Sequence, residues 1–179
     1  MRASPRIVWT ALTALVGLLL LAAAPAARAN EAAEYRLKAA FVYNFLNFVE
    51  WAPTAEPVFS LCIVGNDPFG AEIDGLAGKA VGTRRIELVR KSGTDGVRAC
   101  HAVFVAAAPA DRLGRTLEAL RGAPVLTIAD SADAARQGAM LGLRVANSRI
   151  VFDANVQAAR AAGLTISSRL LRLASEVIQ

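Results

Sequence analysis

Few residues in this sequence are of the types that perform catalysis. Histidine is the side chain that most often transfers protons near neutral pH, and the chain has one, His101. It lies in an apolar stretch, where a lone histidine is usually a packed or surface side chain. The sequence contains no Gly-x-Ser-x-Gly motif for a nucleophilic serine. The run Gly65–Gly70 lacks the lysine and hydroxyl residue of a Walker loop. We therefore expect a protein that is not an enzyme and that uses no cofactor.

The two cysteines, Cys62 and Cys100, allow two interpretations. An even number of cysteines in an exported protein is typical of a disulfide. A bridge that closes a loop of about 38 residues would stabilise the fold by roughly 4 kcal/mol in the chain-entropy description. The alternative is a metal or nucleophilic thiol site that includes His101. A metal site needs three or four ligands at recognisable spacing, so we favour the disulfide and predict no metal.

Acidic and amide side chains follow the predicted strands at several points. Asp130 and Asp133 lie near a helix start, where acids complement the helix dipole. Asp153 and Asn155 lie where a strand passes into a helix, so helix capping accounts for them. Ligands of open α/β sheets bind beyond the carboxyl ends of strands. The Gly65–Gly70 loop and Asp130 therefore remain a candidate small-ligand site.

The first 29 residues have the pattern of a secretion signal. Arg2 and Arg6 precede an uncharged apolar run, and Ala27 and Ala29 place small residues where signal peptidase requires them. An uncleaved membrane anchor is the alternative, because the apolar run is just long enough to span a bilayer. Pro25 and the alanine-rich exit favour cleavage after Ala29. We expect a signal peptide over residues 1–29 and a mature protein in the periplasm.

The composition of residues 30–179 limits the class of protein. Removal of three arginines and no acids lowers the formal charge from +5 to +2, so a nucleic-acid partner is not indicated. About 150 residues are enough for one compact core. We expect one soluble domain over residues 30–179.

The order of the predicted elements indicates the fold class. Residues 31–51 have helical periodicity with an aromatic stripe (Phe41, Phe45, Phe48), which packs in the core or also docks a partner or a second copy. Buried strands are predicted at 58–64, 85–89, 100–107 and 124–128, with helical segments between them, and a hairpin at 140–152. Helices are predicted at 154–162 and 167–178. The alternation predicts an α/β fold: a single three-layer domain with a mixed, mostly parallel sheet flanked by helices.

Three segments of the chain resemble one known family. They are Lys38–Phe45 continuing to Glu50–Pro53, the strand and loop Leu61–Gly70, and the closing segment Phe152–Asn155 with Ala158–Ala174. Together they are similar to the YfiR family of periplasmic regulators, over nearly the whole mature chain.

The resemblance implies a function that operates by binding. Proteins of this family restrain a membrane-bound diguanylate cyclase by contacting its periplasmic domain. An outer-membrane lipoprotein that binds peptidoglycan can sequester them, and cyclic di-GMP then rises and favours biofilm. The family also tends to form homodimers. We expect this chain to be a negative regulator of such a cyclase; the alternative is a periplasmic small-ligand sensor that feeds a receptor or kinase.

The resemblance also implies roles for individual residues. Cys62 and Cys100 match the positions of a family disulfide. A second cysteine pair of the best-known relatives is absent here, so redox control through that pair is not expected. The partner surface of relatives corresponds to Met140, Leu141, Asp153 and Asn155. In the adjoining run this chain has alanine at 134 and 139, where the family has an aromatic residue and a glycine. Exposed apolar groups beside a charge suit a protein–protein site, but the same pattern is produced when Met140 and Leu141 face the core.

Overall fold

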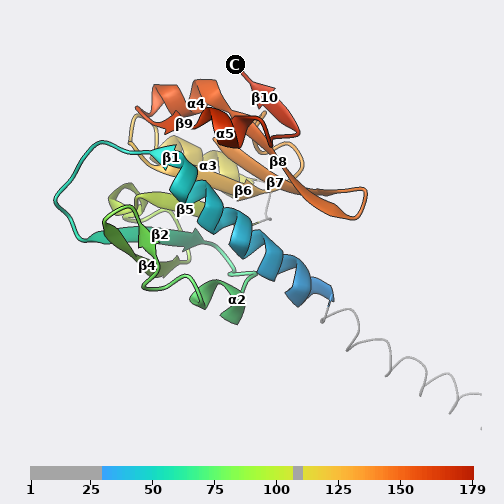
Figure 1. Cartoon of the computed structure of the whole chain (residues 1–179), viewed down its shortest axis with the longest axis horizontal. Helices are drawn as coiled ribbons and strands as arrows, with labels where there is room; N and C mark the ends of the chain where they lie inside the picture. Colours follow the sequence, from blue (N-terminus) through green and yellow to red (C-terminus); the bar gives the residue numbers. More distant parts are fainter. Residues whose placement is uncertain (1–29, 107–110) are drawn as a thin grey trace, which may run out of the picture. The chain divides into compact units, whose positions relative to one another are not determined.

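The computed structural model describes residues 30–106 and 111–179 (Figure 1). The predicted signal peptide therefore lies outside the described residues. The chain divides into two compact units, Met1–Glu34 and Tyr35–Gln179. The described part of the first unit, residues 30–34, is helical. The second unit holds the sheet and all the sites described below.

The sheet of the second unit is mixed and mostly parallel, as the alternation of elements predicts. Within the described ranges it has eight strands in the order β10-β8-β7-β6-β5-β2-β4-β3. The pairs β3–β4 and β7–β8 are antiparallel, and the other pairs are parallel. β1 and β9 form a separate two-stranded sheet. In chain order the strands of the described ranges are β1 (Val49–Glu50), β2 (Val58–Val64), β3 (Ala80–Val81), β4 (Arg84–Lys91), β5 (Ala102–Val105), β6 (Leu126–Asp130), β7 (Leu141–Ala146), β8 (Arg149–Asn155), β9 (Thr165–Ile166) and β10 (Glu176–Ile178).

Helices cover both faces of the sheet. Phe59, Leu61 and Ile63 of β2 belong to one buried cluster, and the alternate residues Cys62 and Val64 belong to another, because successive strand residues point to opposite faces. The first cluster includes side chains of the first helix, α2, α4 and α5, and the second includes those of η1 and α3. The fold is thus a three-layer α/β domain. Its helical segments are residues 30–48, α2 (Ala71–Asp74), the 3-10 turn η1 (Val97–Ala99), α3 (Asp111–Ala119), α4 (Val156–Ala161) and α5 (Ser168–Leu171).

The predicted hairpin between β7 and β8 is present. Asn147 and Ser148 both have positive φ, 49° and 59°, and Ala146 pairs with Arg149 across the turn. Two central residues with positive φ define the tight turn whose twist matches that of the flanking strands. The hairpin makes the sheet mixed and sets β7 directly beside β8.

The first helix ends earlier than its periodicity predicts. It stops at residue 48, and Val49 and Glu50 form β1, which pairs with Ile166 and Thr165 of β9. The prediction of a helix through residue 51 was therefore wrong at its end. The backbone hydrogen bonds to β9 replace the last helical turn, and they involve residues more than 100 positions away in the sequence.

The C-terminal helix is also much shorter than predicted. Instead of one helix over 167–178, α5 ends at Leu171 and Glu176–Ile178 form β10, parallel to β8. The Ser167 side chain caps α5 by accepting a hydrogen bond from the Leu170 backbone N–H. β8 would otherwise be an edge strand, and its unpaired backbone groups bond to the tail.

Candidate protein-binding site

The four residues assigned to the partner surface lie together on β7, on β8 and just before β7. Leu141 pairs with Ala154, Gly142 pairs with Asp153, and the Asn155 N–H donates to the Met140 carbonyl at 2.8 Å. All four are buried, with exposures of 5% for Met140, 0% for Leu141, 6% for Asp153 and 8% for Asn155. Their role in binding stays a prediction. In the structure, Asp153 and Asn155 hydrogen-bond to neighbouring segments, and Met140 lines a groove beside them.

Asp153 anchors the C-terminal tail to the hairpin. Its carboxylate accepts two hydrogen bonds from the Arg144 guanidinium, at 2.8 and 3.2 Å. Arg144 also donates to the Ser175 hydroxyl, and Asp153 is the residue opposite Glu176 of β10. The hydrogen bonds to Asp153 raise the pKa of Arg144 above its ordinary value. The two parallel hydrogen bonds fix the orientation of the Arg144 guanidinium. Arg144 in turn holds the C-terminal tail through Ser175.

Asn155 is the N-cap of α4. Its Oδ1 accepts a hydrogen bond from the Ala158 N–H at 2.7 Å, and its Nδ2 donates to the Ala135 carbonyl at 2.9 Å. The sequence left open whether Asp153 or Asn155 caps this helix, and the structure assigns the cap to Asn155. The side chain thus fixes α4 and the 131–139 segment to each other.

Loss of the Asn155 cap has a predictable cost. We expect Asn155→Ala to lower the free energy of unfolding by about 1–2 kcal/mol, because the helix loses its N-cap acceptor and the Ala135 carbonyl loses a donor. Asn155→Ser is the matched control, since its hydroxyl keeps a capping oxygen and adds no charge while the amide donor is lost, and we expect it to cost less. Urea denaturation measures both values. Equal stability of Asn155→Ala and the unaltered protein would show that the cap contributes nothing.

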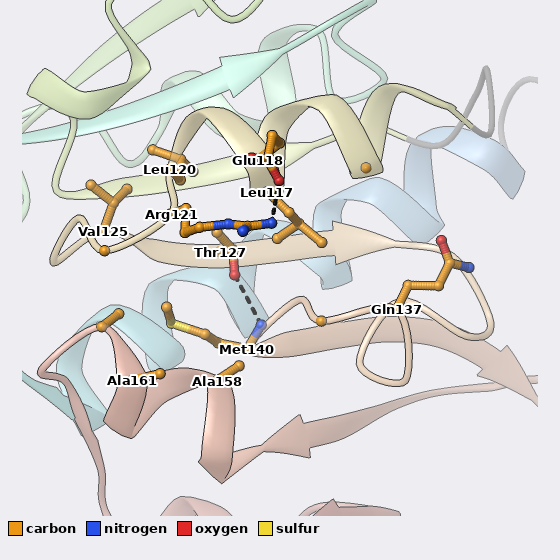
Figure 2. A pocket seen from close by; sticks show the side chains of 14 residues that line it. Leu117, Glu118, Leu120, Arg121, Val125, Thr127, Gln137, Met140, Ala158 and Ala161 are labelled. Carbon is orange, nitrogen blue, oxygen red and sulfur yellow. Dashed lines mark hydrogen bonds and ion pairs between the residues drawn. The ribbon is translucent and has the colours of Figure 1, made fainter.

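A groove of about 390 Å³ opens beside Met140, between α3 and α4 (Figure 2). Its floor includes Thr127, whose hydroxyl accepts a hydrogen bond from the Met140 N–H at 2.9 Å. Leu117 comes from α3 and Leu120 directly follows this helix, and Arg121 forms an ion pair with Glu118 at the groove. The complete lining is Gly114, Leu117, Glu118, Leu120, Arg121, Gly122, Val125, Thr127, Gln137, Gly138, Met140, Ala158, Ala161 and Ala162.

The lining of this groove suits a protein partner. Small residues from α4, including the exposed Ala161, leave room for an incoming apolar side chain. The Arg121–Glu118 pair supplies charge of both signs at the rim. The lining thus combines apolar side chains with polar ones such as Thr127 and Gln137, and protein-binding surfaces likewise combine the two. Met140 is the predicted partner residue that lines it, while Asn155 holds α4 in place.

A second, more apolar groove of about 520 Å³ lies along the first helix. It is lined by Phe41, Asn44, Phe45, Phe48, Ile150, Val151, Phe152, Leu170, Leu173 and Ser175. The aromatic stripe predicted on this helix therefore packs in part in the core, where Phe45 is fully buried against Phe152 at 4.9 Å between ring centroids. Phe41 and Phe48 are only partly buried and line the groove. Whether the stripe also docks a partner stays a prediction.

At the predicted ligand site, at the carboxyl ends of the strands, the acidic side chains form ion pairs with other residues of the chain. β2 lies between β4 and β5, so its carboxyl end is where the strand order reverses. At the carboxyl end of β6, both carboxylate oxygens of Asp130 accept from Lys38 Nζ at 2.8 Å, and the Tyr35 hydroxyl donates to one of them at 2.9 Å. In the Gly65–Gly70 loop, Asp67 accepts from Arg90 and from the Phe69 N–H. These groups tie the first helix and the loop to the sheet.

Sequence reasoning missed the role of Lys38. Its ammonium group is 92 residues from Asp130 in sequence and its side chain is almost completely buried. The sequence does indicate that Lys38 is buried, because it lies four residues before Val42 and therefore on the apolar face of the helix. A lysine in that position requires a buried acid as its partner, although the sequence does not say which one.

The cysteine pair forms the predicted disulfide, Cys62–Cys100. It joins β2 to the segment before β5 and belongs to the cluster of buried side chains under α3. Within the described ranges, no group of three or more His, Cys, Asp and Glu side chains is arranged to hold a metal ion. Nor is any helix there both long and apolar enough for a transmembrane span.

Comparison with known proteins establishes the family. The sequence profile of the YfiR/HmsC-like family matches residues 35–175, which is most of the second compact unit. This chain belongs to the YfiR/HmsC-like family. The resemblance of its three segments to YfiR proteins is thereby confirmed. Members of this family are periplasmic regulators of diguanylate cyclase signalling, and the disulfide of this YfiR/HmsC-like protein agrees with an oxidising compartment.

Two solved structures are similar to this YfiR/HmsC-like protein. One is a conserved domain protein from Vibrio cholerae O1 biovar eltor, 12% identical at a TM-score of 0.55, with 80% of this chain and 60% of that chain covered. The other is the ABC domain from Streptococcus pneumonia in complex with L-Trp, 10% identical at a TM-score of 0.49, with 67% and 55% covered. The chain thus spans 60% of the length of the Vibrio structure. At this identity the likeness to the Vibrio structure concerns the fold alone.

Proposed function

We propose that this protein is a periplasmic negative regulator that binds the periplasmic domain of a membrane diguanylate cyclase and restrains cyclic di-GMP production. The observation that carries the proposal is the family match over residues 35–175. Cleavage after Ala29 would release the domain into the periplasm. An outer-membrane lipoprotein as a second partner, and a homodimer, remain predictions from the family resemblance.

The groove between α3 and α4 supports the proposal physically. It offers apolar lining for anchor side chains and a charged pair at its rim, in the region where the resemblance places the partner surface. Anchors that fill such pockets contribute most of the energy of a protein interface. A regulator that acts by contact needs this kind of surface and no catalytic group.

Deletion of the gene tests the function, and a groove variant tests the surface. We expect cyclic di-GMP to rise in the deletion strain and to return when the unaltered protein is supplied. Ala161→Trp should fail to restore repression, because the indole fills the groove and weakens binding by about tenfold or more. Gln157→Trp is the matched control: it adds the same indole to an exposed position of α4 that does not line the groove.

The outcomes separate the function from the surface. Cyclic di-GMP that stays unchanged on deletion would reject the cyclase as the target. A rise on deletion, with full repression by Ala161→Trp, would keep the function and reject the groove. Calorimetry with the isolated periplasmic domain of the cyclase, and thermal unfolding of each variant, distinguish lost binding from lost folding.

A further inference from the structure

A cluster of aromatic and basic side chains lies at the amino ends of the parallel strands, at the opposite edge of the sheet from Asp130. Trp51 follows β1, Phe59 is in β2, Arg84 begins β4 and His101 precedes β5. The Trp51 and Phe59 rings meet edge to face at 4.9 Å, and the His101 ring stacks on Phe59 at 5.0 Å. The proposed function uses none of these residues.

Arg84 is a buried cation without an anionic partner in contact. The residue is 8% exposed, and within the described residues its guanidinium makes no hydrogen bond or ion pair. It lies instead over the rings of Phe59 and Trp51, at 4.8 and 5.8 Å from their centroids. Burial lowers the pKa of Arg84, and the charge of Glu56 opposes this effect. A guanidinium carries five N–H donors, and those of Arg84 are not fully shielded from solvent, so an acceptor from outside the chain can reach them.

Trp51 presents a second donor without an acceptor. Its Nε1 is the one buried side-chain nitrogen or oxygen, among the residues that the structure describes, that lacks a hydrogen-bond partner. Buried indole N–H groups usually find an acceptor. The unsatisfied indole N–H and the nearby Arg84 guanidinium, which has nitrogens that are not fully shielded from solvent, could both donate to one acceptor from outside the chain.

The His101 ring borders this pair in a fixed orientation. Its Nδ1 accepts a hydrogen bond from the Ser60 N–H at 3.0 Å. Burial, together with the positive charge of Arg84, lowers the pKa of His101. The neutral ring therefore carries its proton on Nε2, which lies 3.5 Å from the exposed carboxylate of Glu56.

We propose that Trp51 and Arg84, flanked by the rings of Phe59 and His101, form a binding site for a carboxylate group attached to an apolar or aromatic body. The carboxylate would accept a bidentate pair of hydrogen bonds from Arg84 and a further one from the Trp51 indole. The faces of Trp51 and Phe59 would contact the apolar body. Glu56 borders the site with a side chain that is 69% exposed, and its negative charge disfavours an entering anion.

Titration with benzoate, followed by NMR on the purified protein, tests this site. The indole N–H resonance of Trp51 is assigned by its loss in Trp51→Phe, and we expect benzoate at millimolar concentration to move it downfield. Benzamide, which has the same ring and no charge, should not. Arg84→Lys keeps the positive charge but loses the planar fork, so we expect it to weaken benzoate binding about tenfold. Glu56→Gln should strengthen it.

A second ligand distinguishes between the carboxylate of a free small molecule and that of an acidic side chain on a partner protein. Acetyl-Gly-Glu-Gly-amide presents the group as a protein side chain would, whereas benzoate represents a free small molecule. A response to benzoate alone assigns the site to a small molecule, and a response to the peptide alone assigns it to an acidic side chain of a partner. No movement of the Trp51 resonance with either ligand, or equal responses to benzoate and benzamide, would overturn the proposal. Circular dichroism of Arg84→Lys verifies that the variant is folded.

Discussion

Replacement of both cysteines by alanine, Cys62→Ala with Cys100→Ala, is expected to lower the free energy of unfolding by about 4 kcal/mol. The bridge joins residues 38 positions apart. It therefore restricts the unfolded chain far more than it restricts the folded one. Because a small domain is stable by only about 5–15 kcal/mol in total, this loss would be a large fraction of its stability. Urea denaturation with the linear extrapolation measures it.

A reductant provides the control for the disulfide prediction. The unaltered protein in excess dithiothreitol should unfold at nearly the same urea concentration as the double variant, because both lack the cross-link. The reductant should leave the double variant itself unchanged. A difference in stability below about 1 kcal/mol between oxidised protein and double variant would contradict the chain-entropy estimate.

Lys38→Met is expected to destabilise the protein by about 3–5 kcal/mol, the cost of leaving one member of a buried ion pair uncompensated. Lys38 and Asp130 are both almost fully buried, and the ammonium group lies 2.8 Å from each carboxylate oxygen. With Lys38 removed, Asp130 retains the Tyr35 hydroxyl as a donor, which does not balance a negative charge. The first helix would lose the charged contact that ties it to the end of β6.

A double-mutant cycle separates the pair from the packing around it. We expect Asp130→Asn to be destabilising too, since Lys38 then loses the carboxylate that lies 2.8 Å from its ammonium group. The combination of Lys38→Met with Asp130→Asn should be more stable than the sum of the single effects indicates, because each single change already removes the same charged contact. Strict additivity of the two single effects would show that Lys38 and Asp130 do not interact energetically. Tyr35→Phe should cost less than Lys38→Met, about 1.5–3 kcal/mol, as expected for one hydrogen bond to a charged group.

The family resemblance identified the region of the candidate binding surface but not its accessible residues. Transfer by position gave Met140, Leu141, Asp153 and Asn155, and the structure places all four in one region of the hairpin. It also buries them, so the accessible part of that region consists of other residues, among them Ala161 and Leu117. Small and apolar residues on two separate helices form no recognisable sequence motif. They line a groove only because the fold brings the two helices together. The Trp51 and Arg84 cluster could not be read from the sequence for the same reason.

The sequence by itself determined the central architecture of this protein. The short apolar run Val58–Val64, which is followed by turn residues, forms a strand that is mostly buried, and Asn147-Ser148 between two strands forms a tight turn. The tertiary structure alone decided that Lys38 pairs with Asp130, that the first helix ends at residue 48, and that Glu176–Ile178 form a strand. The periodicity of apolar residues in the sequence indicates local secondary structure, because residues close together in the sequence determine it. The partner of a buried charge and the pairing of a sheet edge depend on residues far apart in sequence, and these become adjacent only when the chain folds.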